Sequence, residues 1–135
     1  MGFHYLAARQ TSDITLKRLK IGNCYIYKDQ GQIIATVTYY RHKTDSEHKL
    51  YLHSDVATYG QLAVHPDFQK KGLASLIIKF VEQLAKKDNA KRIVVDTAEK
   101  NEKLVNYYKN KGYTIIDHTN WSTTNYTSVL LCKDL

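Results

Sequence analysis

Residues 59–97 constrain the fold more strongly than any other part of the chain, because they contain two strand patterns separated by one helix pattern. Residues 59–64 (YGQLAV) predict a short strand, and residues 92–97 (RIVVDT) predict a second strand that is covered on both faces. The apolar residues between them follow the spacing of an amphipathic helix over residues 72–88: Leu73, Leu76, Ile77, Phe80, Val81 and Leu84. A strand, a helix and a strand in this order predict a parallel strand pair with a right-handed crossover.

The remaining sequence predicts antiparallel strands and a second helix around this unit. Gln30-Gly31 separates two stretches rich in β-branched and aromatic residues, which is typical of a hairpin. Residues 5–19 carry a broken helical pattern, and residues 41–49 form a polar loop. The other predicted elements are strands at 23–29, 32–40, 113–118 and 126–133 and a helix from Asn101, a good N-cap, to Lys111. We therefore predict one α/β domain over residues 1–135, with a mixed, mostly antiparallel sheet and one parallel βαβ unit.

Composition excludes several classes of protein. Cys24 and Cys132 are far apart, which predicts reduced, buried thiols in a cytoplasmic protein rather than a disulfide scaffold. The histidines are scattered without the spacing of a metal site, and no stretch reaches the roughly 20 apolar residues of a membrane span. The net charge of +7 suits an anionic cofactor, an acidic partner or nucleic acid. Because the lysines are spread out, we expect no nucleic-acid partner, and because no apolar span is present, we expect no membrane partner.

The segment between the first strand and the helix predicts an anion site. A helix start offers unpaired N–H groups and the positive end of the helix dipole. Gly72 lets a phosphate approach the backbone, Ala74 keeps the next turn open, and the Ser75 hydroxyl is a further donor. Lys70 and Lys71 add positive charge. The alternative is a plain loop in which the glycine only turns the chain; the P-loop and GxGxxG patterns are absent.

Two motifs in this order resemble the GNAT superfamily of N-acetyltransferases. Gln69 to Ala74 matches the family's pyrophosphate loop, Gln/Arg-x-x-Gly-x-Gly/Ala, and follows an apolar strand that ends in Leu62-Ala63-Val64-His65-Pro66. The segment Asn101-x-x-Leu104-x-x-Tyr107-Tyr108-x-x-x-Gly112-Tyr113 is similar to the family's Asn…Tyr…Gly-Phe/Tyr signature. The resemblance covers residues 20–135 and is strongest over 59–113.

The resemblance implies a GNAT-like acyl-CoA N-acyltransferase fold with acetyl-CoA or coenzyme A as the cofactor. The acetyl group would pass to a primary amine of a small molecule or peptide by direct attack in a ternary complex. Strand 59–64 should separate from strand 92–97 to admit the pantetheine arm, and the N–H near Leu62 should polarise the thioester carbonyl. By this resemblance the cofactor-binding residues are Leu62, Ala63, Val64, Gln69, Lys70, Lys71, Gly72, Leu73, Ala74, Ser75 and Asn101.

The resemblance also makes Tyr108 the catalytic acid that protonates the leaving thiolate, since a phenol with a pKa of ~10 is protonated at neutral pH. Asn101 and Tyr108 are seven residues apart, which places them on one face of the second helix. The alternative is that Tyr108 is a core aromatic; Tyr107 is a weaker candidate for the acid and a better one for packing.

The chain departs from the family at the general base and at the N-terminus. No carboxylate stands in the strand before Leu62, and the nearest substitutes are His53, Asp55 and His65. Because only about 20 residues precede the first clear strand, we expect the family's first strand to be missing or much reduced. We then expect the acceptor site to be open or completed by a second copy of the chain. These departures leave a second function open, a catalytically weak acyl-CoA-binding regulatory module. The amine is also open, and the aromatic residues Tyr39, Tyr40, Trp121 and Tyr126 suit either its pocket or packing within the sheet.

Overall fold

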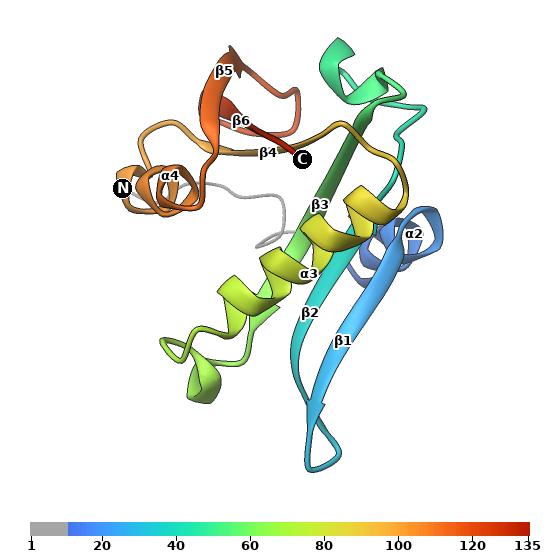
Figure 1. Cartoon of the computed structure of the whole chain (residues 1–135), viewed down its shortest axis with the longest axis vertical. Coiled ribbons are helices and arrows are strands. Elements are labelled where there is room, and N and C mark those ends of the chain that lie inside the picture. The colour runs from blue at the N-terminus through green and yellow to red at the C-terminus, as the bar shows by residue number, and fades with distance from the viewer. Residues whose placement is uncertain (1–10) are drawn as a thin grey trace.

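The computed structural model describes residues 11–135 and contains a six-stranded sheet in the order β1-β2-β3-β4-β6-β5. Helix α3 crosses one face of this sheet, and α4 lies beside the β5–β6 end (Figure 1). The strands are β1 (Asn23–Asp29), β2 (Gln32–Tyr40), β3 (Val56–Val64), β4 (Arg92–Ala98), β5 (Thr114–Thr119) and β6 (Ser128–Asp134). The helices are α2 (Ser12–Ile21), α3 (Leu73–Lys87) and α4 (Glu102–Asn110), with short 3-10 helices η1 (Lys49–Leu52) and η2 (Pro66–Phe68). The predicted mixed α/β fold is confirmed.

The predicted hairpin is the pair β1 and β2, which run antiparallel. Its turn residues, Gln30 and Gly31, have φ of 48° and 81°. A two-residue turn with positive φ at both positions matches the right-handed twist of the strands it joins. Both strand boundaries agree with the prediction from the sequence.

The βαβ unit consists of β3, α3 and β4, and it is the part of the fold that creates an opening in the sheet. The parallel pairing joins only Val56–Thr58 to Arg92–Val94. Beyond Thr58, β3 remains paired with β2 but has no registered partner in β4. The expected separation of these strands is therefore present, and it begins in the middle of β3.

Alternate residues of the central strands face two different sides. Val37 of β2 and Val95 of β4 pack with α3 in the main core. Val94 of β4 and Val56 of β3 face the other side, where they form a second cluster with Tyr51 of η1. The sheet thus separates an α3 side from an opposite side that carries η1.

Helix α2 packs on this opposite side. Thr11 caps its start, because the Thr11 hydroxyl accepts a hydrogen bond from the N–H of Ile14 at 3.4 Å. A Cβ at Gly22, just after the helix, would lie 2.6 Å from Thr38 Cγ2 and 2.7 Å from Tyr40 Cε1. The backbone of α2 therefore approaches the sheet closely. The first residues of the predicted 5–19 helix lie outside the described residues.

Two expectations about single residues need correction. Cys132 is buried as expected, but Cys24 is exposed because it lies on the edge strand β1. Residues 92–97 are not covered on both faces throughout, since Asp96 is exposed where β4 has lost its partner β3. Among residues 11–135, no helix has the length and apolar character needed to cross a membrane.

Candidate active site

The predicted anion site lies where β3 passes through η2 into α3. Gly72 is the N-cap of α3 with φ of 79°, and no side chain caps the helix start. A Cβ added to Gly72 would meet nothing within 4 Å, so the backbone is open to a ligand at this point. Lys70 and Lys71 are exposed beside it. A 15-residue helix with uncapped N–H groups and adjacent positive charge fits a phosphate group.

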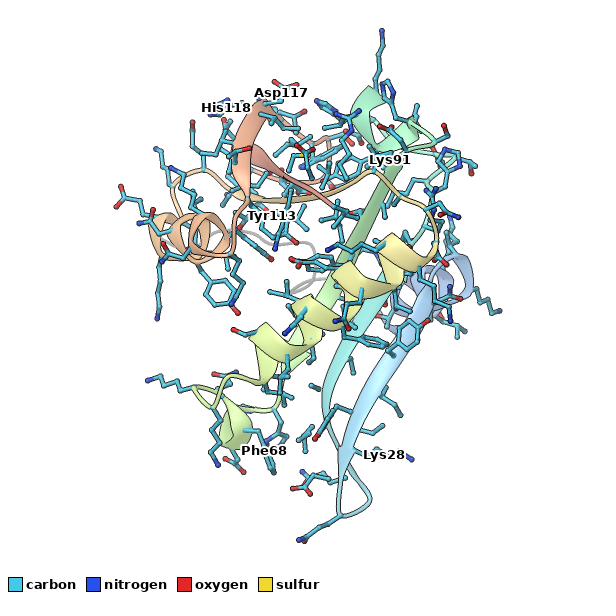
Figure 2. All side chains as sticks on the ribbon, in the orientation of Figure 1. Lys28, Phe68, Lys91, Tyr113, Asp117 and His118 are labelled. Carbon is cyan, nitrogen blue, oxygen red and sulfur yellow. The ribbon has the colours of Figure 1, made fainter. Side chains whose placement is uncertain are left out.

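Gln69 and Ser75 are held by contacts within this region. The Gln69 side-chain amide donates to the backbone carbonyl of Val64 at 3.0 Å, which ties the loop to the end of β3. The Ser75 and Tyr107 hydroxyls are hydrogen bonded at 3.0 Å. This bond joins the first turn of α3, where Leu73 and Ala74 also lie, to α4. Phe68, at the end of η2, marks this tip of the molecule in Figure 2.

Strand β3 carries a bulge at the position predicted to polarise a carbonyl. Thr36 pairs with Ala63 and Thr38 pairs with Gly60, so Gln61 and Leu62 together oppose one residue of β2. Gln61 has φ of 52°, and its side-chain oxygen accepts a hydrogen bond from the Thr38 hydroxyl at 2.8 Å. Bulges redirect the backbone of a strand, and they occur next to active sites. This bulge lies beyond Thr58, on the stretch of β3 without a partner in β4.

Tyr108 projects from α4 into the core beside the opening. Its residue surface is 9% exposed, and its ring packs against Tyr107 and Tyr113 with centroids 5.9 and 5.5 Å away. Burial raises the pKa of Tyr108 to about 12, although a hydrogen bond with Tyr59 opposes the rise. The phenol is therefore protonated at neutral pH, as a proton donor must be. Its burial also agrees with the alternative of a core aromatic.

The Tyr108 hydroxyl stands at one end of a tyrosine network that reaches α3. The Tyr59 and Tyr113 hydroxyls are 3.3 Å apart, and the Tyr113 hydroxyl donates to Glu82 at 2.9 Å. Lys133 donates to the other oxygen of Glu82 at 2.9 Å. Tyr113 lies between α4 and α3 in Figure 2. This network positions Tyr59 against Tyr108.

Asn101 has a defined structural contact. Its side-chain oxygen accepts a hydrogen bond from the N–H of Leu104 at 3.2 Å, so Asn101 caps α4, as its residue type predicts. The residue is the N-cap and lies just before Glu102, the first residue of the helix.

Asp96 is the carboxylate that the sequence analysis missed. It lies on β4 two residues beyond Val94, the last residue paired with β3, and it shares Val94's side of the sheet. Asp96 accepts hydrogen bonds from the Tyr51 hydroxyl at 2.7 Å and from the Trp121 indole N–H at 3.1 Å. A carboxylate has about four acceptor positions, so it retains room for a further donor. The available signal was an acidic residue directly after the apolar run of residues 93–95.

The base candidates named from the sequence lie elsewhere. Asp55 precedes β3 at the end away from the opening and forms an ion pair with Arg92 at 3.2 Å. His53 closes η1 through its backbone N–H. The His65 side chain accepts a hydrogen bond from the N–H of Asp67 at 3.2 Å and caps η2. None of these contacts places the three groups beside Tyr108.

The aromatic candidates divide between the two sides of the sheet. Tyr39 is 1% exposed in the α3-side core, and its hydroxyl donates to Asp88 at 3.0 Å, so it serves packing. Tyr40 and Trp121 belong to the opposite side, where Trp121 packs against Tyr51 at 6.1 Å. This side, which carries Asp96, is the candidate acceptor surface.

A stretch of β3 without a partner in β4, a bulge and an uncapped helix start follow one another along the chain, as expected of an acyl-CoA-dependent acyltransferase. The model of the Acetyltransferase (GNAT) family matches residues 4–113, and the chain belongs to this family. S-(2-succino)cysteine N-acetyltransferase of Bacillus subtilis (strain 168) is 30% identical over 120 residues, which cover 84% of this chain and 67% of that protein. The protein is accordingly an acetyl-CoA-dependent N-acetyltransferase.

Solved structures share the fold. A GNAT family acetyltransferase from Elizabethkingia anophelis with acetyl-CoA bound has a TM-score of 0.73 at 21% identity, covering 96% of this chain and 87% of that one. Ard1 from Thermoplasma volcanium has a TM-score of 0.75 at 14% identity, with 93% and 80% covered. A Bacillus subtilis acetyltransferase in complex with CoA has a TM-score of 0.71 at 18% identity, with 93% and 84% covered.

Proposed function

We propose that the protein transfers the acetyl group of acetyl-CoA to the primary amine of a small molecule or peptide by direct attack in a ternary complex. The observation that carries this proposal is the pair of groups at the opening between β3 and β4. The Tyr108 hydroxyl approaches from α4, and the Asp96 carboxylate approaches from the opposite side of the sheet. The two are close enough for the negative charge of Asp96 to contribute to the raised pKa of Tyr108.

The residues around the opening fit the cofactor. The backbone N–H groups of residues 70–75 would hold the pyrophosphate, with Lys70 and Lys71 beside it. Leu62, Ala63 and Val64 would pair through their backbone with the pantetheine arm, because β4 leaves this stretch of β3 without a partner. When bound, acetyl-CoA supplies a thioester whose carbonyl carbon accepts the amine nitrogen and whose sulfur leaves as a thiolate.

The chain's own groups would then handle the charge and the protons. The N–H near Leu62, redirected by the bulge, would donate a hydrogen bond to the carbonyl oxygen. Asp96 would accept a proton from the amine, directly or through a water molecule, and Tyr108 would give its phenolic proton to the sulfur. Tyr59 would orient the Tyr108 hydroxyl.

The free thiols of Cys24 and Cys132 support the further proposal that the protein works in the reducing cytoplasm.

The first experiment is calorimetric titration with acetyl-CoA of the wild type, Gly72→Glu and Gly31→Glu. Both glycines have positive φ and open space, so the two substitutions impose similar backbone strain. Only Gly72 lies at the helix start, where a carboxylate would repel phosphate. We expect Gly72→Glu to abolish binding and Gly31→Glu to retain it; equal loss in both variants would contradict the phosphate site.

Turnover is then measured as thiol release with a panel of amines. S-(2-succino)cysteine is included, since the Bacillus subtilis relative is named for it. Initial rates over both substrates should give intersecting double-reciprocal lines, because direct attack needs both substrates bound together. Parallel lines would contradict direct attack, and tight acetyl-CoA binding without any turnover would favour the regulatory module.

A further inference from the structure

The side of the sheet that carries Asp96 also carries two cations without an acidic partner. Lys43 lies in the segment after β2, and its ammonium stands over the rings of Tyr40 and Tyr51, 4.9 and 5.2 Å from their centroids. Arg18 lies on α2 and is close enough to act electrostatically on Lys43 and Tyr40. Within residues 11–135, none of the ion pairs includes Lys43 or Arg18.

Two acidic groups near Asp96 are already engaged. Asp117 pairs with His48 at 2.9 Å, and Glu47 accepts hydrogen bonds from the backbone and the hydroxyl of Ser122. Asp96 is linked to Lys43 through one ring of Tyr51: the Tyr51 hydroxyl donates to Asp96, and Lys43 stands over the face of the ring. Asp96 and Arg18 are thus both close enough to Lys43 to act on it electrostatically.

Partial burial makes an unpaired ammonium unfavourable. Burial lowers the pKa of Lys43, and Arg18 lowers it further, while Asp96 opposes the change. The tyrosine rings offset part of this cost through cation–π attraction. An anionic group bound between Lys43 and Arg18 would offset more, because charge-assisted hydrogen bonds are strong where water is partly excluded.

We infer that the acceptor is a small amine that carries carboxylate groups, and that Lys43 and Arg18 bind those carboxylates while the amine faces Asp96. The inference rests on the proposed function and names the substrate class of the same site. An amino acid with an acidic side chain has this charge distribution, and a polyamine does not. The unpaired cations therefore make Lys43 and Arg18 residues that determine specificity.

The test is equilibrium titration of the CoA-saturated protein with three probes that differ in carboxylates. S-(2-succino)cysteine has carboxylates on the side chain and the backbone, S-ethylcysteine has only the backbone carboxylate, and S-ethylcysteine amide has none. We expect affinity to fall in that order. Lys43→Met and Arg18→Met should each weaken binding of S-(2-succino)cysteine about 10- to 100-fold, the usual effect of losing a charged hydrogen bond, and leave the amide unchanged.

Two controls separate recognition from structure. Lys28→Met removes the same charge from an exposed lysine on β1, near the far end of the hairpin in Figure 2, and should change none of the affinities. Thermal unfolding of each variant reports any loss of stability. If Lys43 served only to pack against the tyrosines, Lys43→Met would lower the unfolding temperature and affect all three probes equally, which would overturn the inference.

A charge reversal gives a second, independent outcome. Lys43→Glu should reduce binding of S-(2-succino)cysteine and improve binding of the diamine putrescine. A wild type that binds the amide as tightly as S-(2-succino)cysteine would also overturn the inference. Because binding is measured apart from turnover, the two failures can be told apart. Absence of turnover with every amine of the panel would contradict the proposed function, whereas turnover of other amines without binding of S-(2-succino)cysteine through Lys43 and Arg18 would overturn this inference alone.

Discussion

Tyr107 and Tyr108 are adjacent in the sequence, but their hydroxyls contact different parts of the molecule. Tyr107 is half-buried and bonds to Ser75 at the start of α3, whereas Tyr108 is buried at the opening, with Tyr59 as its hydrogen-bond partner. A helix turns by about 100° per residue, so neighbouring residues cannot share a face. This geometry makes the pair a matched set for testing which tyrosine is the acid.

Replacing Tyr108 by Phe should lower kcat by about 100-fold or more, because the thiolate would then leave without a proton donor. The Kd of acetyl-CoA should stay unchanged, since the ring still fills the core. Tyr107→Phe is the control and should reduce kcat only slightly. Rates and calorimetric affinities of the two variants decide the point, and a larger loss in Tyr107→Phe would exchange their roles.

Asp96→Asn tests the proposed base at the same scale. The amide keeps the shape and one hydrogen-bond acceptor but cannot take up a proton from the amine. We expect kcat/KM to fall by about 100-fold near neutral pH and to recover as the pH rises, because more of the amine is then already neutral. Asp55→Asn breaks the ion pair with Arg92 far from the opening and should leave kcat unchanged. A pH-independent loss in Asp96→Asn would contradict a role as base.

At the scale of elements, the contact between α2 and the sheet links the N-terminal helix to the acceptor surface. Gly22 has an ordinary φ of −103°, so its importance is the space around it rather than its backbone freedom. A methyl group there would overlap Thr38 and Tyr40, and Tyr40 is one of the two rings beneath Lys43. Displacing α2 would therefore also displace Arg18.

Gly22→Ala should lower the free energy of unfolding by about 1–3 kcal/mol, the usual cost of overpacking, and should weaken binding of carboxylated amines. The affinity for acetyl-CoA should not change, because α3 lies on the other side. Gly60→Ala is the control for stability, since its added methyl would meet nothing within 4 Å. Urea unfolding and the two titrations measure these effects; equal destabilisation by both variants would contradict a specific close contact at α2.

Most elements could be predicted from the sequence because each has a local cause. The Gln30-Gly31 turn, the apolar stripe of α3 and the Asn101 cap all act within a few residues of themselves. β3 begins at Val56, three residues earlier than predicted, because its first residues are specified by pairing with β4 and by packing against Tyr51. Such partners are distant in the chain and have no local pattern.

The cofactor side of the site could be predicted for the same reason, and the acceptor side could not. The loop from Gln69 to Ser75 is one continuous segment with a recognisable spacing. The acceptor surface combines Arg18, Lys43, Tyr51, Asp96 and Trp121, which come from five separate segments. Only the folded sheet brings them to one side, so a search of the strand before the loop could not find Asp96.

At the scale of the whole molecule, the cofactor loop leads into α3 on one side of the sheet, and the candidate acceptor surface lies on the other side. Buried tyrosines lie on both sides, near the opening. Tyr59, Tyr108 and Tyr113 pack on the α3 side, and Tyr51 packs on the other. Burial is the first cause that raises the pKa of each of these tyrosines and of Tyr39. Their shared response to pH is a property of the whole fold.

Stability should therefore fall at alkaline pH. The unfolded chain loses its phenolic protons near pH 10, while the folded chain retains them to higher pH, so the stabilising contribution is complete below about pH 10 and is lost as the pH rises through the folded pKa values. Each such tyrosine costs about 1.4 kcal/mol per pH unit in that range. Lys43 has the opposite effect on stability just below its ordinary pKa of 10.5, because its folded pKa is lowered, and one lysine offsets little of the loss.

Urea midpoints measured from neutral pH upward should decline steeply above about pH 10, and Tyr59→Phe should reduce the steepness by one tyrosine's share. An unchanged midpoint across this range would mean that the tyrosines ionise while folded, and that the packing around the opening is too loose to hold Tyr108 as a proton donor.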